Sequence, residues 1–193
     1  MENNLLKELR ELTGAGMMDI KEALAEAANE KDKAIEILRK KGAMKMGKKS
    51  DRIANEGLVE AYIHPGGRVG VLLELNCETD FVARTDAFKE LSKGLALHIA
   101  AANPLYITSA EVPPEVVEKE KEIYKEQLKD KPADVVEKIL EGKIGKFYEE
   151  VCLMDQPFVK DPSLKVSQFF AEAGAKMGEN IQIRRFVRYA LGN

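Results

Sequence analysis

The sequence predicts an α+β fold, in which a small N-terminal bundle of helices precedes a core of helices packed on a small antiparallel sheet. Three observations support this class. Apolar residues recur at helical spacing through the first part of the chain. The apolar period changes to two between Gly57 and Leu75, and again near the C-terminus. The segments between these strands have the spacing of amphipathic helices.

Three apolar stripes at helical spacing predict three short helices at the N-terminus. The stripes consist of Leu5, Leu6, Leu9, Leu12, Ile20, Leu24, Ala27, Ala34, Ile35 and Leu38. The glycines of Thr13–Gly16 predict a tight turn after the first helix. Asp19, with Glu22 three residues later, resembles a capping box and predicts that the second helix begins there. Lys41 followed by Gly42 predicts the end of the third helix.

Residues 39–52, "RKKGAMKMGKKSDR", carry seven basic side chains and one acidic one. A solvated linker and helix face is the simpler interpretation, and contact with RNA or an acidic partner surface is the alternative. Gly42 to Lys49 nearly spells a P-loop, but Lys49 replaces the Ser or Thr that would hold Mg²⁺. The segment also follows a helix rather than a strand, so we exclude a nucleotide-binding loop here.

A hairpin and a third strand are predicted from alternation. Val59, Ala61 and Ile63 alternate before the turn "HPGGR", and a second alternating run follows it. This second run buries one face through Val69, Val71, Leu73 and Leu75. Near the C-terminus Ile181, Ile183 and Val187 alternate, and we expect this strand to close the sheet because an isolated hairpin is marginally stable.

The remaining segments are predicted to be helical. One helix runs from about Phe88 to Asn103-Pro104, and we interpret its His98 as a packed helix residue. Two charged helices with thin apolar stripes flank Lys131-Pro132, which predicts an antiparallel arm at about residues 115–152. A last helix is expected at about Val166 to Met177.

Composition excludes several classes of protein. The net charge of −3 disfavours a protein that binds nucleic acid over its whole surface, so no direct nucleic-acid contact is expected. No apolar run is long enough for a membrane span and the start lacks a signal peptide, which predicts a cytoplasmic protein. Cys77 and Cys152 are then expected to be reduced. No catalytic constellation, zinc-ligand spacing or cofactor loop is recognisable, so we expect no enzyme, metal site or cofactor.

Four segments together resemble bacterial elongation factor Ts. They are "LRELTGAGMMDIKEAL" at residues 9–24, "LELNCETDFVAR" at 73–84, "QPFVKD" at 156–161 and "GENIQIRRF" at 178–186. They occur in the family's order, and the resemblance covers essentially the whole chain. The length resembles the family's short form, which has one copy of the sheet-containing core where the long form has two. A second core half would then come from a second chain, which makes a noncovalent homodimer possible. Ile183 and Val187 are candidate contacts, although burial within one chain explains these two residues equally well.

The resemblance implies a guanine nucleotide exchange factor for elongation factor Tu. It implies that residues 1–53 form a three-helix module resembling a ubiquitin-associated domain with a basic linker, and that residues 54–193 form the core. It assigns to Thr79, Asp80, Phe81 and Val82 the displacement of Mg²⁺ in the partner. Docking on the partner is assigned to the N-terminal module, through Thr13, Gly14, Gly16, Met17 and Met18.

Two side-chain questions stay open at this point. A lone Phe81 after a strand is more often a core residue, whereas its polar neighbours and the resemblance favour presentation to a partner. Met17 and Met18 are either adaptable partner contacts or part of the small helical core. Two other classes of function are weighed as well: an RNA- or ribosome-associated protein using residues 39–52, and a structural assembly module using the charged arm.

Overall fold

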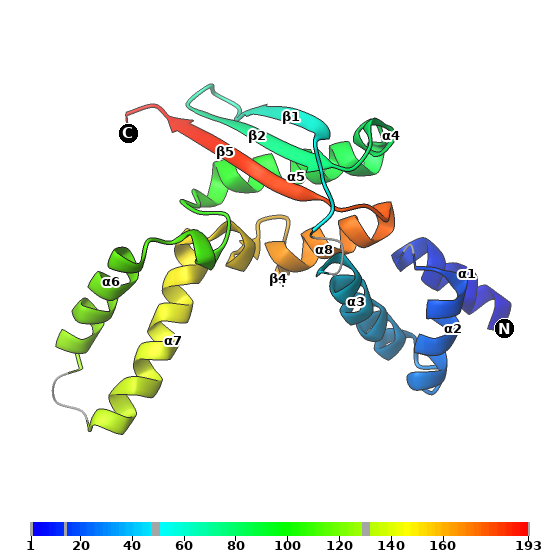
Figure 1. The fold of residues 1–193 in the computed structure, drawn as a ribbon, viewed down its shortest axis with the longest axis horizontal. Helices are drawn as coiled ribbons and strands as arrows, with labels where there is room; N and C mark the ends of the chain where they lie inside the picture. The colour runs from blue at the N-terminus through cyan, green and yellow to red at the C-terminus, as the bar shows by residue number, and fades with distance from the viewer. Residues whose placement is uncertain (1, 14, 48–50, 129–131, 193) are drawn as a thin grey trace.

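The computed structural model describes residues 2–13, 15–47, 51–128 and 132–192 of the chain. Within these residues it contains eight α-helices, a three-stranded antiparallel sheet and a short two-stranded one, which confirms the α+β class. Figure 1 shows the sheet lying over α5 (Asp86–Ala102) and α8 (Val166–Met177), with the N-terminal helices toward one end and the arm toward the other. None of the described helices is both long and apolar enough to cross a membrane.

The N-terminal helices are α1 (Glu2–Thr13), α2 (Met17–Glu26) and α3 (Lys31–Gly47), which bury an apolar cluster of their own. The start predicted for the second helix is wrong. The N-cap is Gly16, in extended conformation, so Asp19 lies inside the first turn. An acidic side chain there still favours the helix because it complements the positive end of the helix dipole.

The end predicted for the third helix is also wrong, because the helix does not end at Gly42. It continues to Gly47 because Gly42 lies against α8: a Cβ at this position would be 3.2 Å from the Cβ of Ala175. The glycine therefore permits close packing of two helices rather than ending one of them. The helical conformation of Gly42–Gly47 also agrees with the exclusion of a P-loop.

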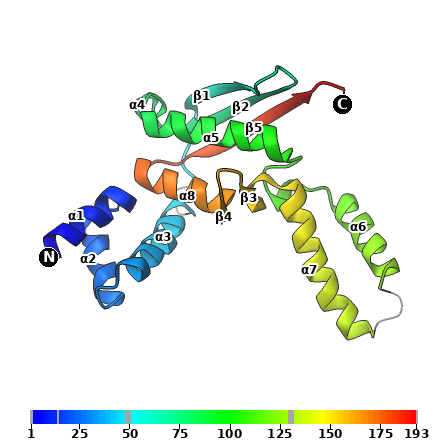
Figure 2. The ribbon, with the colours of Figure 1, turned by 180° about the vertical axis from the view of Figure 1, so that it is seen from behind.

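The main sheet has the order β1-β2-β5, formed by β1 (Glu56–Ile63), β2 (Val69–Cys77) and β5 (Gln182–Ala190). Val71, Leu73 and Leu75 are buried as predicted, and they pack with the apolar faces of α5 and α8 into the largest core cluster. Figure 2, seen from behind, shows α5 running along one face of this sheet.

The other face of the sheet is apolar and open, and we call it the outer sheet face. Its exposed apolar side chains are Val59, Ile63, Leu72, Val187 and Tyr189. Leu72 pairs with Val187 across β2 and β5. Ile183 belongs to the opposite face, where it packs on the core, so of the two candidate dimer contacts only Val187 is accessible.

The arm forms as predicted from α6 (Pro114–Glu126) and α7 (Ala133–Val151), which run antiparallel away from the sheet (Figure 1). Its base carries a third apolar cluster around Val112, Phe147 and Cys152. Cys77 and Cys152 are both buried free thiols. The structure also contains elements that the sequence did not predict: a small hairpin of β3 (Pro157–Phe158) and β4 (Asp161–Lys165), and two 3₁₀ turns at Ser109–Glu111 and Leu153–Asp155.

His98 is packed, as predicted. Its side chain is 1% exposed, and its ring is hydrogen-bonded on both nitrogens. Nδ1 accepts from the Val159 backbone N–H at 3.1 Å, so Nε2 donates to Gln156 Oε1 at 2.9 Å. Burial lowers the pKa of His98, against a smaller opposing effect of the Gln156 hydrogen bond. The neutral ring thus holds the residues on both sides of β3, Gln156 and Val159, against α5.

Candidate partner-binding site around Phe81

Phe81 lies on α4 (Asp80–Ala83), a single helical turn that follows directly on the buried strand β2. Its side chain is 77% exposed, whereas Phe88, seven residues later, is completely buried. Phe81 is therefore not a core residue, and the interpretation based on composition alone is wrong. An exposed aromatic ring on an ordered turn is typical of a residue that contacts a partner.

The turn around Phe81 is fixed by its own caps. Thr79, in extended conformation, is the N-cap, and its Oγ1 accepts from the Val82 backbone N–H at 3.4 Å. Arg84 reaches back to Asp80, with 2.8 Å between Nη2 and Oδ2. Ala83 is buried and Val82 packs against the core. Val82 and Ala83 thus attach the turn to the core and leave Phe81 in solvent.

A second set of bonds comes from the opposite end of the chain, in the loop between α8 and β5. The Glu179 carboxylate accepts from the backbone N–H groups of Glu78 and Thr79, both at 3.0 Å, and from Thr79 Oγ1 at 2.6 Å. In return, Glu78 Oε1 accepts from the Asn180 backbone N–H at 2.6 Å. Sequence analysis assigned no role to Glu179 or Asn180; their only signal was their place in the "GENIQIRRF" segment.

Cys77 ends β2 just before this turn, and its Sγ–H donates to the Thr79 carbonyl at 3.1 Å. Burial raises the pKa of the Cys77 thiol to about 11, and the negative charge of Glu179 adds to this effect. The thiol therefore stays protonated at neutral pH and can serve as the donor that the geometry requires.

The N-terminal candidates form a second exposed group, at the turn between α1 and α2. Met18 is 69% exposed and Met17 is 39% exposed, so the interpretation that they fill the small core is wrong. Thr13 fixes the end of α1, since its Oγ1 donates to the Leu9 carbonyl at 2.6 Å and accepts from the Ala15 N–H at 3.3 Å. Gly16 caps α2, and Gly14 lies outside the described residues.

The structure does not bring these two groups together into one pocket. Both nevertheless lie toward the same end of the long axis of the molecule, since α4 and α2 share that end in Figures 1 and 2 while the arm occupies the other.

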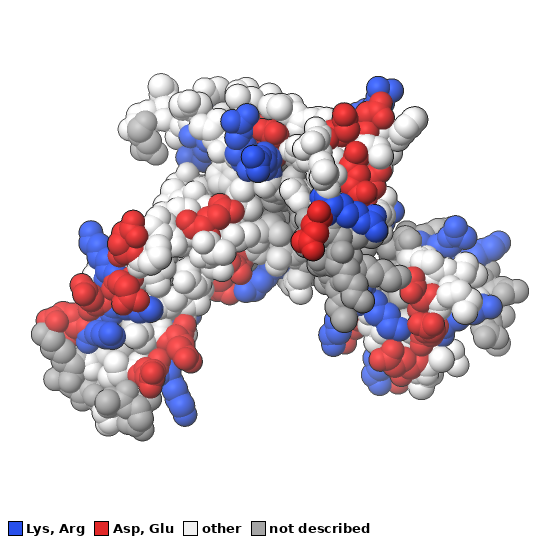
Figure 3. Space-filling model, in the orientation of Figure 1, with Lys and Arg blue, Asp and Glu red and all other residues white. Residues whose placement is uncertain are grey.

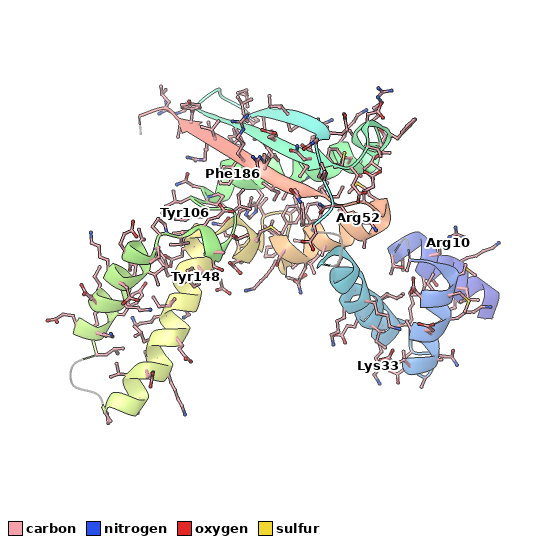
Figure 4. All side chains as sticks on the ribbon, in the orientation of Figure 1. Arg10, Lys33, Arg52, Tyr106, Tyr148 and Phe186 are labelled. Carbon is pink, nitrogen blue, oxygen red and sulfur yellow. The ribbon has the colours of Figure 1, made fainter. Side chains whose placement is uncertain are left out.

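Several basic side chains of residues 39–52 are used inside the molecule. Arg39 pairs with Glu172 of α8 at 2.8 Å, and Lys41 lies 3.5 Å and 3.6 Å from two carboxylates of α2. Arg52 lies 3.5 Å from Glu78, beside the loop that joins α8 to β5 (Figure 4). The side chains of 43–50 lie outside the described residues. On the face drawn in Figure 3, blue and red side chains are interleaved, without the continuous basic surface typical of an RNA-binding protein.

No group of three or more His, Cys, Asp or Glu side chains in the described part of the chain is arranged to hold a metal ion. The site consists instead of one presented aromatic ring, the turn that carries it and a separate pair of exposed methionines. Such an arrangement can bind a protein surface.

Comparison with known proteins identifies the family. The family model described as "Elongation factor TS" matches residues 3–193. The chain belongs to the elongation factor Ts family. Elongation factor Ts of Fervidobacterium nodosum is 59% identical over 190 residues, which cover 97% of this chain and 96% of the relative. The proteins of the same name from Carboxydothermus hydrogenoformans and Thermotoga maritima are 58% and 56% identical over 192 and 189 residues. These alignments cover 98% of this chain each, and 88% and 95% of the two relatives.

Family membership confirms the resemblance on which the sequence-based functional prediction depended, and it makes the chain a translation elongation factor. The roles of individual residues are a separate question. The matched region includes both the Phe81 turn and the turn between α1 and α2, so the two exposed surfaces belong to the family-matched part of the chain.

Proposed function

We propose that this elongation factor Ts family member is a guanine nucleotide exchange factor for elongation factor Tu, with Phe81 as the residue that disturbs the nucleotide site. The observation that carries the proposal is the 77% exposure of Phe81 on a turn that is capped and attached to the core. A rigid aromatic residue offers a large contact area with few rotatable bonds to fix on binding, so it loses little conformational entropy there.

The mechanism is a difference in affinity. The factor must bind the nucleotide-free GTPase more tightly than the GDP-bound GTPase, and linkage then requires that it weakens GDP binding by the same factor. Nucleotide and Mg²⁺ are held by closely fitted oxygen and backbone contacts, so a small displacement at the phosphate and magnesium site loses much binding free energy. No bond is made or broken, and the protein catalyses exchange without being an enzyme in the bond-making sense.

The four residues of the Phe81 turn have distinct parts in this proposal. Phe81 enters the partner's nucleotide site and displaces the groups that hold Mg²⁺. Thr79 caps the turn and Val82 attaches it to the core, so both fix the direction of the ring. Asp80 carries a negative charge close to the position where Mg²⁺ and phosphate are bound, with Arg84 as its partner until the complex forms.

Docking is assigned to the turn between α1 and α2 and to the start of α2, where Met17 and Met18 are exposed. Methionine side chains are flexible and polarisable, so they adapt well to an apolar groove on a partner surface. Residues 1–53 are proposed to act as the docking module and residues 54–193 as the core that carries the Phe81 turn.

A noncovalent homodimer is proposed through the outer sheet face. Val59, Ile63 and Tyr189 are 67%, 66% and 72% exposed there, and a second copy of the same face would cover them. Cys77 and Cys152 are both buried, so a disulfide between copies is not expected to contribute.

Calorimetric titration of elongation factor Tu with the protein tests the exchange proposal. We expect tight binding to the nucleotide-free GTPase and weaker binding when GDP and Mg²⁺ are present. Equal affinity in the two conditions would refute the mechanism, because a ligand that binds two states equally well does not shift the equilibrium between them.

A further inference from the structure

Three hydrogen bonds to Glu179 hold the backbone from which Phe81 is presented. One carboxylate oxygen accepts from the N–H groups of two consecutive residues, Glu78 and Thr79, and the other accepts from Thr79 Oγ1. Glu179 is a hundred residues away along the chain, so these bonds are not a by-product of local helix geometry. Hydrogen bonds to an ionised carboxylate are also stronger than those between neutral groups.

Thr79 links this carboxylate to the helical turn itself. Its hydroxyl hydrogen is directed at Glu179, which leaves the Oγ1 lone pairs free to accept from the Val82 N–H. Val82 follows Phe81 directly, so the carboxylate, the hydroxyl and the amide form a chain of bonds that ends next to the aromatic ring. A change at Glu179 is therefore transmitted to the orientation of Phe81.

The loop that carries Glu179 is itself fixed. Gly178 ends α8 in the left-handed conformation, with φ +74°, which turns the chain out of the helix directly before Glu179. Asn180 donates its backbone N–H to Glu78 and its side-chain amide to the Arg52 carbonyl, each at 2.6 Å. The two glutamates thus bind each other's loops reciprocally, and Arg52 lies 3.5 Å from Glu78 to balance their charge.

A four-residue helix supplies few internal hydrogen bonds, and a single helical turn in water is unstable by itself. If the turn were disordered in the free protein, ordering it on binding would reduce the net free energy that Phe81 contributes to the complex. A fixed direction of the ring in the free protein avoids this loss. We propose that Glu179 is a positioning residue for nucleotide exchange, acting through Thr79 on Phe81. This inference rests on the proposed role of Phe81, which the experiment below tests separately.

The central test is a pair of variants of the full chain, Glu179→Ala and Glu179→Gln. Alanine removes all three acceptors, and GDP release at saturating factor should slow about tenfold, the equivalent of one strong charge-assisted hydrogen bond. Glutamine keeps an oxygen for the two backbone N–H groups and can donate to Thr79 Oγ1, so its rate should stay within about threefold of wild type. Glu90→Ala, an exposed carboxylate on α5, is the matched control and should exchange like wild type.

A double-mutant cycle separates positioning from a general effect on folding. If Glu179 acts through Phe81, Glu179→Ala should slow exchange in the wild-type background and have no further effect in a Phe81→Ala background. Amide hydrogen exchange gives a second readout: the N–H groups of Glu78 and Thr79 should lose protection in Glu179→Ala and keep it in Glu179→Gln. A purely structural role would lower the melting temperature equally in both backgrounds without this local pattern.

The outcomes are distinguishable. If Phe81→Ala slows exchange but folded Glu179→Ala exchanges like wild type, the positioning role is wrong and the proposed function stands. Equal slowing by Glu179→Ala in both backgrounds would also overturn the inference. If folded Phe81→Ala exchanges normally, the proposed function fails and the inference fails with it. Should Glu179→Ala not fold, Thr79→Val carries the test: it removes the linking hydroxyl, and normal exchange by that variant would refute the proposal.

Discussion

Phe81→Ala is expected to change nucleotide exchange much more than it changes folding. The side chain is 77% exposed, so folding buries less than a quarter of it. Complete burial of such a side chain contributes about 1.5–3 kcal/mol, which puts the loss of folding free energy below about 1 kcal/mol. For a chain of 193 residues this corresponds to a fall in melting temperature of about 2–4 °C at most.

The expected loss in the complex is larger. Truncating an aromatic anchor at the centre of an interface costs about 2 kcal/mol or more of binding free energy. Under the proposed mechanism the loss should be greater with the nucleotide-free GTPase than with its GDP complex, because the ring is proposed to act at the site that GDP and Mg²⁺ occupy. GDP release should slow about tenfold for every 1.4 kcal/mol by which the two losses differ.

The assay is release of fluorescent GDP from elongation factor Tu at saturating factor, with the melting temperature of each variant measured alongside. Two variants are matched controls. Leu105→Ala removes an apolar side chain that is 62% exposed and does not belong to α4. It should change neither the rate of GDP release nor the melting temperature appreciably. Phe88→Ala removes a completely buried ring and should cost about 3–5 kcal/mol of folding free energy. A Phe81→Ala protein that melts like Phe88→Ala, or that exchanges normally while folded, would refute the assignment.

Three further predictions concern assembly, organisation and pH. Val187→Glu places a charge on the outer sheet face and should convert a dimer to a monomer in light scattering, whereas a wild-type protein that is already a fully active monomer at micromolar concentration would contradict the dimer. Removing residues 1–53 should leave a core whose circular dichroism is folded but whose affinity for elongation factor Tu is reduced; an unfolded product would place the boundary elsewhere. Burial lowers the pKa of His98, so the unfolded chain takes up a proton below about pH 6.5 that the folded one does not. The contribution of His98 to folding stability is therefore complete above that pH and is lost progressively below it, by up to about 1.4 kcal/mol per pH unit. Urea unfolding of wild type and His98→Gln from pH 5 to 8 tests this, and identical midpoints for the two proteins at every pH would refute it.

The elements that sequence analysis predicted well are those whose apolar pattern is set by one neighbouring layer. The stripe of α5 and the alternation of β2 each face the same core, so their period identified both the element and its buried side. In β1 the alternation gave the period only. Both faces of that strand are partly apolar, with Leu58 and Tyr62 against the core and Val59 and Ile63 outside, and no local signal says which face is covered.

Errors arose where a distant segment determines the local structure. Gly42 has the sequence context of a helix end, and only the presence of α8 makes it a packing position inside a helix. The hydrogen bonds from Glu179 to the Phe81 turn join positions a hundred residues apart. A single glutamate in the sequence does not indicate such a distant contact, because most glutamates are exposed to solvent. Family resemblance predicted a functional role for the Phe81 turn, and the hydrogen bonds that hold this turn in place are visible only in the structure.

The arrangement of the two exposed surfaces predicts how the kinetic constants divide between them. Met17 and Met18 lie on a separate turn from Phe81, and both surfaces lie toward one end of the molecule. Docking through the first surface raises the local concentration of the second at the nucleotide site, so the Phe81 turn need not supply the affinity of the encounter. Removal of residues 1–50 should therefore raise the concentration of factor required for half-maximal exchange and leave the maximal rate nearly unchanged, whereas Phe81→Ala should lower the maximal rate. A truncation that keeps Arg52, from residue 51 onward, should preserve that maximal rate better than one from residue 54, because Arg52 contacts Glu78 and Asn180 beneath the turn. Equal maximal rates for the two truncations would show that this contact does not contribute to holding Phe81.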